Sequence, residues 1–183
     1  MRTFISIDIP FGSALKALHS DLQQNLKGVE MKLAETNQYH ITFAFLGEIR
    51  PDQSNSIVAD LTTIHLPSHH IELSLHGTGI FTHNSQPQVL WVGMEPEKGF
   101  MELYAQIQEV LSKHGFPQEK NHFSPHLTIA RIRKVLPGNN LLALLEKYSN
   151  ASFGKIMLTE FVLYQSILTQ QKPIHRALKI FKF

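Results

Sequence analysis

The chain has 183 residues, of which 43% are hydrophobic and 17% charged, with eleven histidines and no cysteine. This length predicts one domain spanning residues 1–183, and the apolar fraction is typical of a globular protein, which excludes disordered and fibrous chains. Without cysteine there can be no disulfides, thiolate zinc sites or cysteine nucleophiles. The net charge of +2 hides an asymmetry, because residues 1–120 carry a balance of −5 and residues 121–183 a balance of +7. A polyanion would therefore prefer the last third of the chain.

The N-terminal residues do not fit a targeting segment. Residues 1–8 alternate in polarity and include Asp8, so they lack the uninterrupted apolar run of a signal peptide. No stretch approaches the roughly 20 apolar residues that span a bilayer. We therefore expect a soluble, cytoplasmic protein with no membrane partner.

The first half of the chain predicts strands and helices in turn. A strand over 3–9 is closed by Pro10. Ser13 is expected to cap a helix that ends before Gly28, because the leucines between them recur at spacings of three and four. Strands are predicted near 31–34 and 40–46, with Gly47 ending the second, and a second helix begins at Pro51.

The second half adds several strands that follow each other without a helix between them. We predict strands near 71–75 and 89–92 separated by the turn-rich residues 82–88, a helix over 98–114, a strand over 126–132, a short helix around 139–148, and two long strands near 153–167 and 174–183. This order favours a mixed, largely antiparallel α+β fold over a doubly wound parallel sheet.

One pattern occurs twice, and the second copy begins 86 residues after the first. His40-Ile41-Thr42-Phe43-Ala44 is repeated as His126-Leu127-Thr128-Ile129-Ala130. Alternate residues of a strand share a face, so each histidine is expected beside its own threonine, with the apolar residues on the opposite, packed face. Two such strands could bring two imidazoles and two hydroxyls around one cleft.

This residue set suits phosphoester cleavage without a metal ion. One imidazole can take a proton from the attacking oxygen while the other gives a proton to the leaving oxygen, since histidine titrates near neutrality. Threonine hydroxyls can donate hydrogen bonds to the non-bridging phosphate oxygens. A single His-x-Thr in a strand usually marks only a polar residue at a sheet edge, and it is the duplication that favours a site.

The remaining histidines are weaker candidates. His65, His69 and His70 have a ligand-like spacing, but Pro67 interrupts them and only Glu72 lies close by, so we expect no metal site there. The other isolated histidines are predicted to have solvated or capping roles: His76, His83, His114, His122 and His175.

The paired motifs, together with their flanking residues, resemble the two-histidine phosphoesterase superfamily. Within it the chain is similar to the RNA 2′,3′-cyclic phosphodiesterases, historically called bacterial 2′-5′ RNA ligases. The matching segments run from residue 2 to about residue 166 and are Arg2-x-Phe4, 38–48, 79–81, 89–93, 123–131 and 163–166.

The resemblance implies a bilobal α+β fold with pseudo-twofold symmetry, in which antiparallel sheets line a central cleft and helices lie outside. It implies hydrolysis of a 2′,3′-cyclic phosphate RNA end to a 2′-phosphate without a cofactor, with His40 as general acid and His126 as general base. Thr42 and Thr128 would bind phosphate oxygens. We expect the partner to be RNA with such an end, or a related nucleotide, and the protein to be a monomer.

In the family, an aromatic residue after the first motif and an arginine after the second sandwich the terminal base, and Phe45 and Arg131 occupy these places. Strict alternation puts both on the face opposite the histidines, so each strand would have to bulge, twist or end to bring them into the cleft. Residues 170–176, Gln-Gln-Lys-Pro-Ile-His-Arg, replace the glycine and aromatic residue that family members tend to carry.

Two other functions remain open from the sequence. The same site could join a 2′,3′-cyclic phosphate to a 5′-hydroxyl through a 2′-5′ bond, because ligation reverses a transesterification at that phosphate. A nucleotide- or RNA-binding module without turnover is the other, although both histidines and both threonines are present.

Overall fold

The computed structural model describes residues 1–67, 70–95, 97–117, 123–170 and 173–183. Among these residues the strands form two sheets in which every pairing is antiparallel. The four-stranded sheet has the order β3 (His40–Glu48), β1 (Arg2–Asp8), β8 (Glu160–Ile167), β9 (Ile174–Lys182). The five-stranded sheet has the order β2 (Val29–Leu33), β6 (His126–Val135), β5 (Gln86–Glu95), β4 (Ile71–His83), β7 (Ser152–Leu158).

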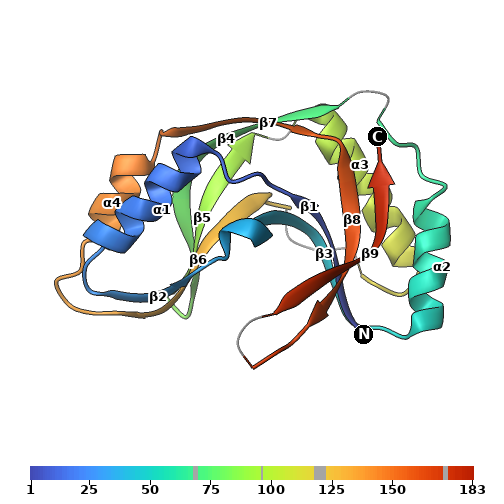
Figure 1. Ribbon diagram of the computed structural model, residues 1–183, viewed down its shortest axis with the longest axis horizontal. Coiled ribbons are helices and arrows are strands. Elements are labelled where there is room, and N and C mark those ends of the chain that lie inside the picture. Colours follow the sequence, from blue (N-terminus) through green and yellow to red (C-terminus); the bar gives the residue numbers. More distant parts are fainter. Residues whose placement is uncertain (68–69, 96, 118–122, 171–172) are drawn as a thin grey trace.

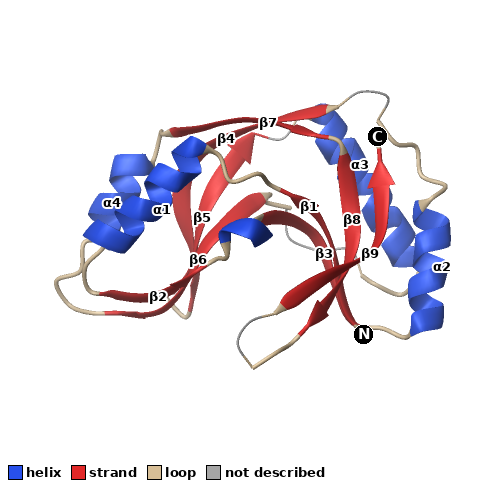
Figure 2. Ribbon diagram, in the orientation of Figure 1, coloured by secondary structure: helices blue, strands red, loops and turns tan. Residues whose placement is uncertain are grey.

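The helices lie on the outer sides of the two sheets (Figure 1). Helices α1 (Ser13–Asn25) and α4 (Leu141–Tyr148) lie beside the five-stranded sheet, and α2 (Pro51–Leu61) and α3 (Lys98–Lys113) lie beside the four-stranded one. A short 3-10 helix, η1 (Thr36–Gln38), immediately precedes β3. Figure 2 shows the strands of both sheets on the inside of the molecule and these four helices at its two ends. This arrangement confirms the predicted α+β fold class with antiparallel sheets inside and helices outside.

The helices form where the apolar periodicity predicts them. In α3 the side chains of Phe100, Leu103, Ile107 and Leu111 recur at three- and four-residue spacings and are buried. In α1 the buried positions are Leu15, Leu18 and Leu22, as the leucine spacing predicts. Ser13 is the first residue of α1 rather than its cap, because Gly12 occupies the N-cap position.

Two predicted segments differ from the structure. The turn-rich segment 82–88 shrinks to a tight hairpin, in which Asn84 and Ser85 adopt positive φ angles of 49° and 60°, so β4 and β5 are much longer than predicted. Paired positive φ values match the right-handed twist of the flanking strands. The predicted strand over 153–167 is two strands, β7 and β8, which belong to different sheets.

No helix among the described residues is both long and apolar enough to cross a membrane.

Candidate active site

The edge strand β3 of the four-stranded sheet contacts β6 of the five-stranded sheet, and a cleft of about 940 Å³ opens where the two sheets meet. Residues from both sheets line it. They include all six residues that the sequence selected: His40, Thr42, Phe45, His126, Thr128 and Arg131. The two His-x-Thr strands therefore come from different sheets and face one space.

A β-bulge follows the threonine in each strand. Between β1 and β3, Ser6 pairs with Thr42 and Ile5 with Ala44, so the register skips Phe43. Between β5 and β6, Trp91 pairs with Thr128 and Leu90 with Ala130, so the register skips Ile129. An extra residue reverses the alternation beyond it.

These bulges carry Phe45 and Arg131 to the cleft side. Phe45 is 68% exposed while the next residue, Leu46, is buried, and Arg131 is exposed while Ile132 is buried. Each strand therefore contains the bulge that its residue, Phe45 or Arg131, needs in order to reach the cleft. Gly47, which was expected to end the strand predicted over 40–46, instead lies within β3 with φ +65°.

The two imidazoles are held in the same way. The Nδ1 of His40 bonds the carbonyl oxygen of Gln38 at 2.6 Å, and the Nδ1 of His126 bonds that of Ser124 at 2.9 Å. A carbonyl can only accept, so Nδ1 carries a proton in both rings, and in the neutral imidazole Nε2 has the free lone pair. Each ring is thereby prepared to exchange a proton at Nε2.

A phenylalanine packs against each histidine. The ring centroids of Phe4 and His40 are 5.3 Å apart, and those of Phe81 and His126 are 4.7 Å apart with the planes nearly perpendicular. Phe81 in turn contacts Trp91, whose indole lies over Gly79. A Cβ on Gly79 would be 2.2 Å from that indole, so glycine is required for this close approach.

The environment of His40 acts on its pKa in opposing directions. Burial lowers the pKa of His40 because the charged imidazolium loses water, and the positive charge of Arg131 acts in the same direction. The hydrogen bond to Gln38 and the carboxylate of Asp8 partly offset this lowering. Asp8 accepts a hydrogen bond from the Tyr164 hydroxyl at 2.6 Å, and burial together with Asp8 raises the pKa of Tyr164.

One histidine of the cleft was not selected from the sequence. His175, predicted to be isolated with a solvated or capping role, lines the cleft with its ring centroid 5.5 Å from that of His40. The pattern around His175 gave no sign of this contact, because it depends on how β9 returns along β8. The departure of residues 170–176 from the family pattern marks this segment as unusual, but it does not place His175 beside His40.

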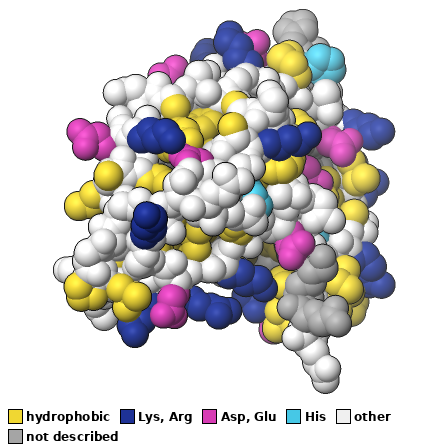
Figure 3. Space-filling view, turned by 60° about the vertical axis from the view of Figure 1, so that its left-hand side comes forward, with side chains coloured by type: hydrophobic (Ala, Val, Ile, Leu, Met, Phe, Trp, Pro, Cys, Tyr) yellow, Lys and Arg dark blue, Asp and Glu magenta, His cyan; other side chains and the backbone are white. Residues whose placement is uncertain are grey.

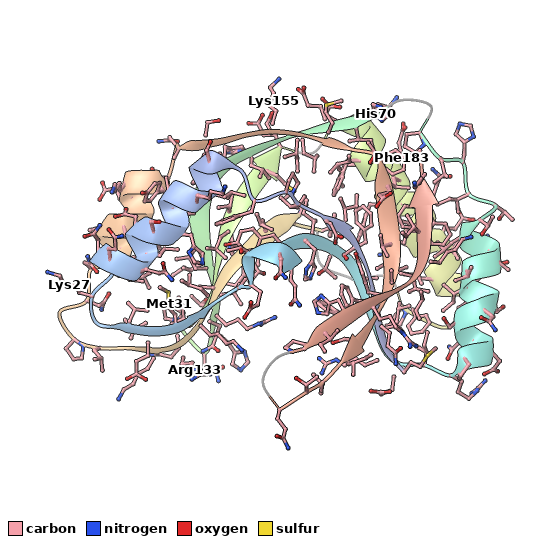
Figure 4. The ribbon with its side chains drawn as sticks, in the orientation of Figure 1. Lys27, Met31, His70, Arg133, Lys155 and Phe183 are labelled. Atoms are coloured by element: carbon pink, nitrogen blue, oxygen red, sulfur yellow. The ribbon has the colours of Figure 1, made fainter. Side chains whose placement is uncertain are left out.

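The other histidines that the structure describes do not line this cleft. His76 lies 3.4 Å from the Glu95 carboxylate, and His114 bonds Asp60 at 2.8 Å, while His122 lies outside the described residues. Figure 4 places His70 at the edge of the molecule, away from β3 and β6. Within the described part of the chain, no group of three or more His, Cys, Asp or Glu could hold a metal ion, and His69 is outside that part.

Fold and site together define a phosphoesterase-like cleft with two histidines, and comparisons with known proteins identify the family. The pattern of the 2′-5′ RNA ligase superfamily matches residues 32–166, and the chain belongs to this superfamily. It is 31% identical over 183 residues to an RNA 2′,3′-cyclic phosphodiesterase of Archaeoglobus fulgidus, covering 100% of both chains. It is 32% identical over 179 residues to the enzyme of the same name from Methanocaldococcus jannaschii, covering 98% of this chain and 99% of that one.

A solved structure has the same fold. The crystal structure of E. coli LigT complexed with 3′-AMP superposes with a TM-score of 0.76 at 22% identity, covering 99% of this chain and 97% of that one. The resemblance inferred from the paired His-x-Thr strands is thereby confirmed.

Proposed function

We propose that the protein hydrolyses RNA ends carrying a 2′,3′-cyclic phosphate to ends carrying a 2′-phosphate, without a metal ion. The observation that carries this proposal is the convergence of two His-x-Thr strands on one cleft, each with its Nδ1 bonded to a carbonyl and its Nε2 left for proton transfer. The relatives named RNA 2′,3′-cyclic phosphodiesterase support the same substrate class.

The reaction assigns one role to each member of the quartet. His126 takes a proton from a water molecule, whose oxygen attacks the phosphorus, and His40 gives a proton to the 3′ oxygen as its bond to phosphorus breaks. The products are a 2′-phosphate and a 3′-hydroxyl. The Thr42 and Thr128 hydroxyls donate hydrogen bonds to the non-bridging oxygens, where negative charge develops.

The lowered pKa of His40 bears on this assignment. A general acid must be protonated, and burial favours the neutral imidazole in the free protein. An anionic phosphate bound beside the ring raises the pKa again, so the protonated form is recovered in the substrate complex. His40 should therefore titrate at higher pH in the pH profile of kcat than in that of kcat/KM, because kcat reports the substrate complex and kcat/KM the free protein.

Electrostatics favours an RNA chain as the substrate. Arg131, Arg133 and Lys134 are exposed on β6, and Lys32 is exposed on β2 next to Arg131. In Figure 4 Arg133 lies low in the view, at the same end of the molecule as Met31 of β2. Phosphates of the strand upstream of the cyclic end would meet these cations, and each contact would release counterions.

The direct test is an RNA oligonucleotide with a 2′,3′-cyclic phosphate, incubated with the protein and a chelator. We expect a 2′-phosphate product, and we expect His40→Ala and His126→Ala each to lower kcat by about 10²–10⁴-fold. His65→Ala, at an exposed histidine, is the matched control. The proposal is wrong if no 2′-phosphate forms, or if both active-site variants keep full activity. Adding an RNA with a 5′-hydroxyl to the same reaction measures the competing 2′-5′ ligation.

A substrate with sulfur in place of the bridging 3′ oxygen tests the two roles. A thiol has a pKa of about 8.5 in cysteine, so a thiolate departs without a general acid. This substrate should restore activity to His40→Ala but not to His126→Ala. Restoration of His126→Ala alone would reverse the acid and base roles.

A further inference from the structure

His175 is a titratable side chain of the cleft that the reaction above does not use. It lies near the start of β9, next to Ser166 of β8 in the strand register. Its ring centroid is 4.9 Å from that of Phe4 and 5.5 Å from that of His40, with the planes close to perpendicular in both pairs. A second imidazole thus lies beside His40 within the cleft.

The strand that carries His175 is joined to the segment that orients His40. The Gln38 side-chain amide donates a hydrogen bond to the Pro173 carbonyl at 3.3 Å, and the Gln38 carbonyl accepts the bond from His40 Nδ1. One residue therefore fixes both the beginning of β9 and the ring of His40. The spacing of the two imidazoles follows from this local network.

The nitrogens of His175 have no hydrogen-bond partner among the described residues. The side chain is partly buried, so it gives up some of its contact with water without a protein partner in return. Polar groups in such positions are normally satisfied, and a ligand in the cleft can supply the missing acceptor.

We propose that His175 is a third ligand-binding imidazole, which donates a hydrogen bond to the phosphate group bound beside His40 and favours a dianionic phosphate when it is protonated. This rests on the proposed function, because the position of the phosphate is taken from it. The ligand class is a terminal phosphate monoester, such as the 2′-phosphate product, which carries more negative charge than the cyclic diester.

The charges around the pair explain why an anion would matter. The groups around His175 are His40 of β3, Asp8 of β1 and the Tyr164 ring of β8. The positive charge of Arg131, on β6, lowers the pKa of His40. Burial and the neighbouring His40 lower the pKa of His175, whereas Asp8 raises it. Two imidazolium groups at this spacing repel each other, and a dianion bound beside both rings offsets that repulsion. Binding of a phosphate monoester should then draw in protons.

The test is calorimetric binding of 2′-AMP and of inorganic phosphate at pH 6 and pH 8, in two buffers with different ionisation enthalpies, which counts the protons taken up. His175→Phe keeps a ring against Phe4 and His40 but has no nitrogens. We expect it to bind 2′-AMP about tenfold more weakly at pH 6, the effect of one charge-assisted hydrogen bond, and to take up fewer protons. At pH 8, where histidine is neutral, the loss should shrink.

Two further measurements separate charge from structure. His175→Gln keeps a neutral donor, so its affinity should lie between those of the wild type and His175→Phe, while its proton uptake matches that of His175→Phe. His65→Gln is the matched control at an exposed histidine, and adenosine, which has no phosphate, should bind all variants alike. Circular dichroism of each variant checks the fold.

The inference is overturned if His175→Phe binds 2′-AMP at pH 6 with wild-type affinity and wild-type proton uptake, or if adenosine binding falls by the same factor as 2′-AMP binding. Turnover of a cyclic-phosphate RNA by the wild-type protein is measured alongside. If the wild-type protein turns over the RNA but His175→Phe binds phosphate as the wild type does, this inference is rejected and the proposed function is not. Absence of turnover rejects the proposed function, whatever the binding data show.

Discussion

Phe43, at the bulge in β3, and Phe45, two residues beyond it, should separate the effects of a substitution on ligand binding and on stability. Both residues line the cleft, but Phe45 is 68% exposed, whereas Phe43 is 3% exposed and packs among the rings of Phe100 and Phe161. Stacking of a base on an aromatic side chain is worth about 1–3 kcal/mol. Phe45→Ala should therefore lower kcat/KM for a cyclic-phosphate nucleotide by about 5- to 150-fold. Its free energy of unfolding should change by less than about 0.5 kcal/mol, because an exposed ring adds little to the core.

Phe43→Ala is the matched comparison, two residues away on the same strand. Removing a buried phenylalanine costs about 3–5 kcal/mol, so urea unfolding should show a large loss of stability. The assay is steady-state hydrolysis of a cyclic-phosphate mononucleotide beside urea titrations of both variants. The reasoning fails if Phe45→Ala destabilises the protein as much as Phe43→Ala does, or if kcat/KM of a fully folded Phe45→Ala equals that of the wild type.

The remaining predictions concern the RNA chain, an ion pair and a glycine. Lys32→Ala should weaken the binding of an oligonucleotide but not of a mononucleotide, and it should reduce the slope of log affinity against log salt concentration by about 0.7. Replacing the upstream phosphate by an uncharged methylphosphonate should abolish the difference between wild type and variant. Equal effects of Lys32→Ala on both substrates would contradict the prediction. Asp21 is 11% exposed, bonds Lys147 at 2.6 Å and has its pKa lowered to about 2, chiefly by that bond, so Asp21→Asn should cost about 1–2 kcal/mol at pH 7. Because the folded pKa lies below the unfolded one, this difference should disappear as the pH falls from about 4 to 2, as acid titrations of unfolding would reveal; a constant difference would refute it. Gly79→Ala should displace the Trp91 indole, lower the free energy of unfolding by about 1–3 kcal/mol and reduce kcat, and a variant with wild-type melting and turnover would refute the role of this contact.

Regular periodicity predicted the elements that obey it. The leucine and isoleucine spacings located α1 and α3 closely, since each helix buries one continuous stripe. The break between β7 and β8 was not predicted, because only Thr159 separates the two strands and threonine is not a turn-forming residue such as glycine or proline. A strand pattern does not state which sheet a strand joins.

The sequence singled out residues that line the cleft, but not the geometry of the two strands that carry them. The duplicated motif selected His40 and His126, and side-chain alternation correctly placed each beside its threonine. The bulges at Phe43 and Ile129 could not be predicted, because both are apolar residues that alternation places on the packed face. His175 depended on tertiary register alone, which a single sequence does not contain.

The division of the motifs between two sheets has a geometric consequence. Each sheet supplies one histidine and one threonine, and the two sheets contact each other through β3 and β6. Figure 3, in which the side of the molecule that carries α1 and α4 comes forward, shows Lys and Arg side chains low on that face. A small rotation of one sheet changes the distance between the imidazoles while leaving both motifs intact. Chains with identical His-x-Thr strands can therefore differ in the size of the phosphoester that fits in the cleft. Residues far from the cleft would then determine that size.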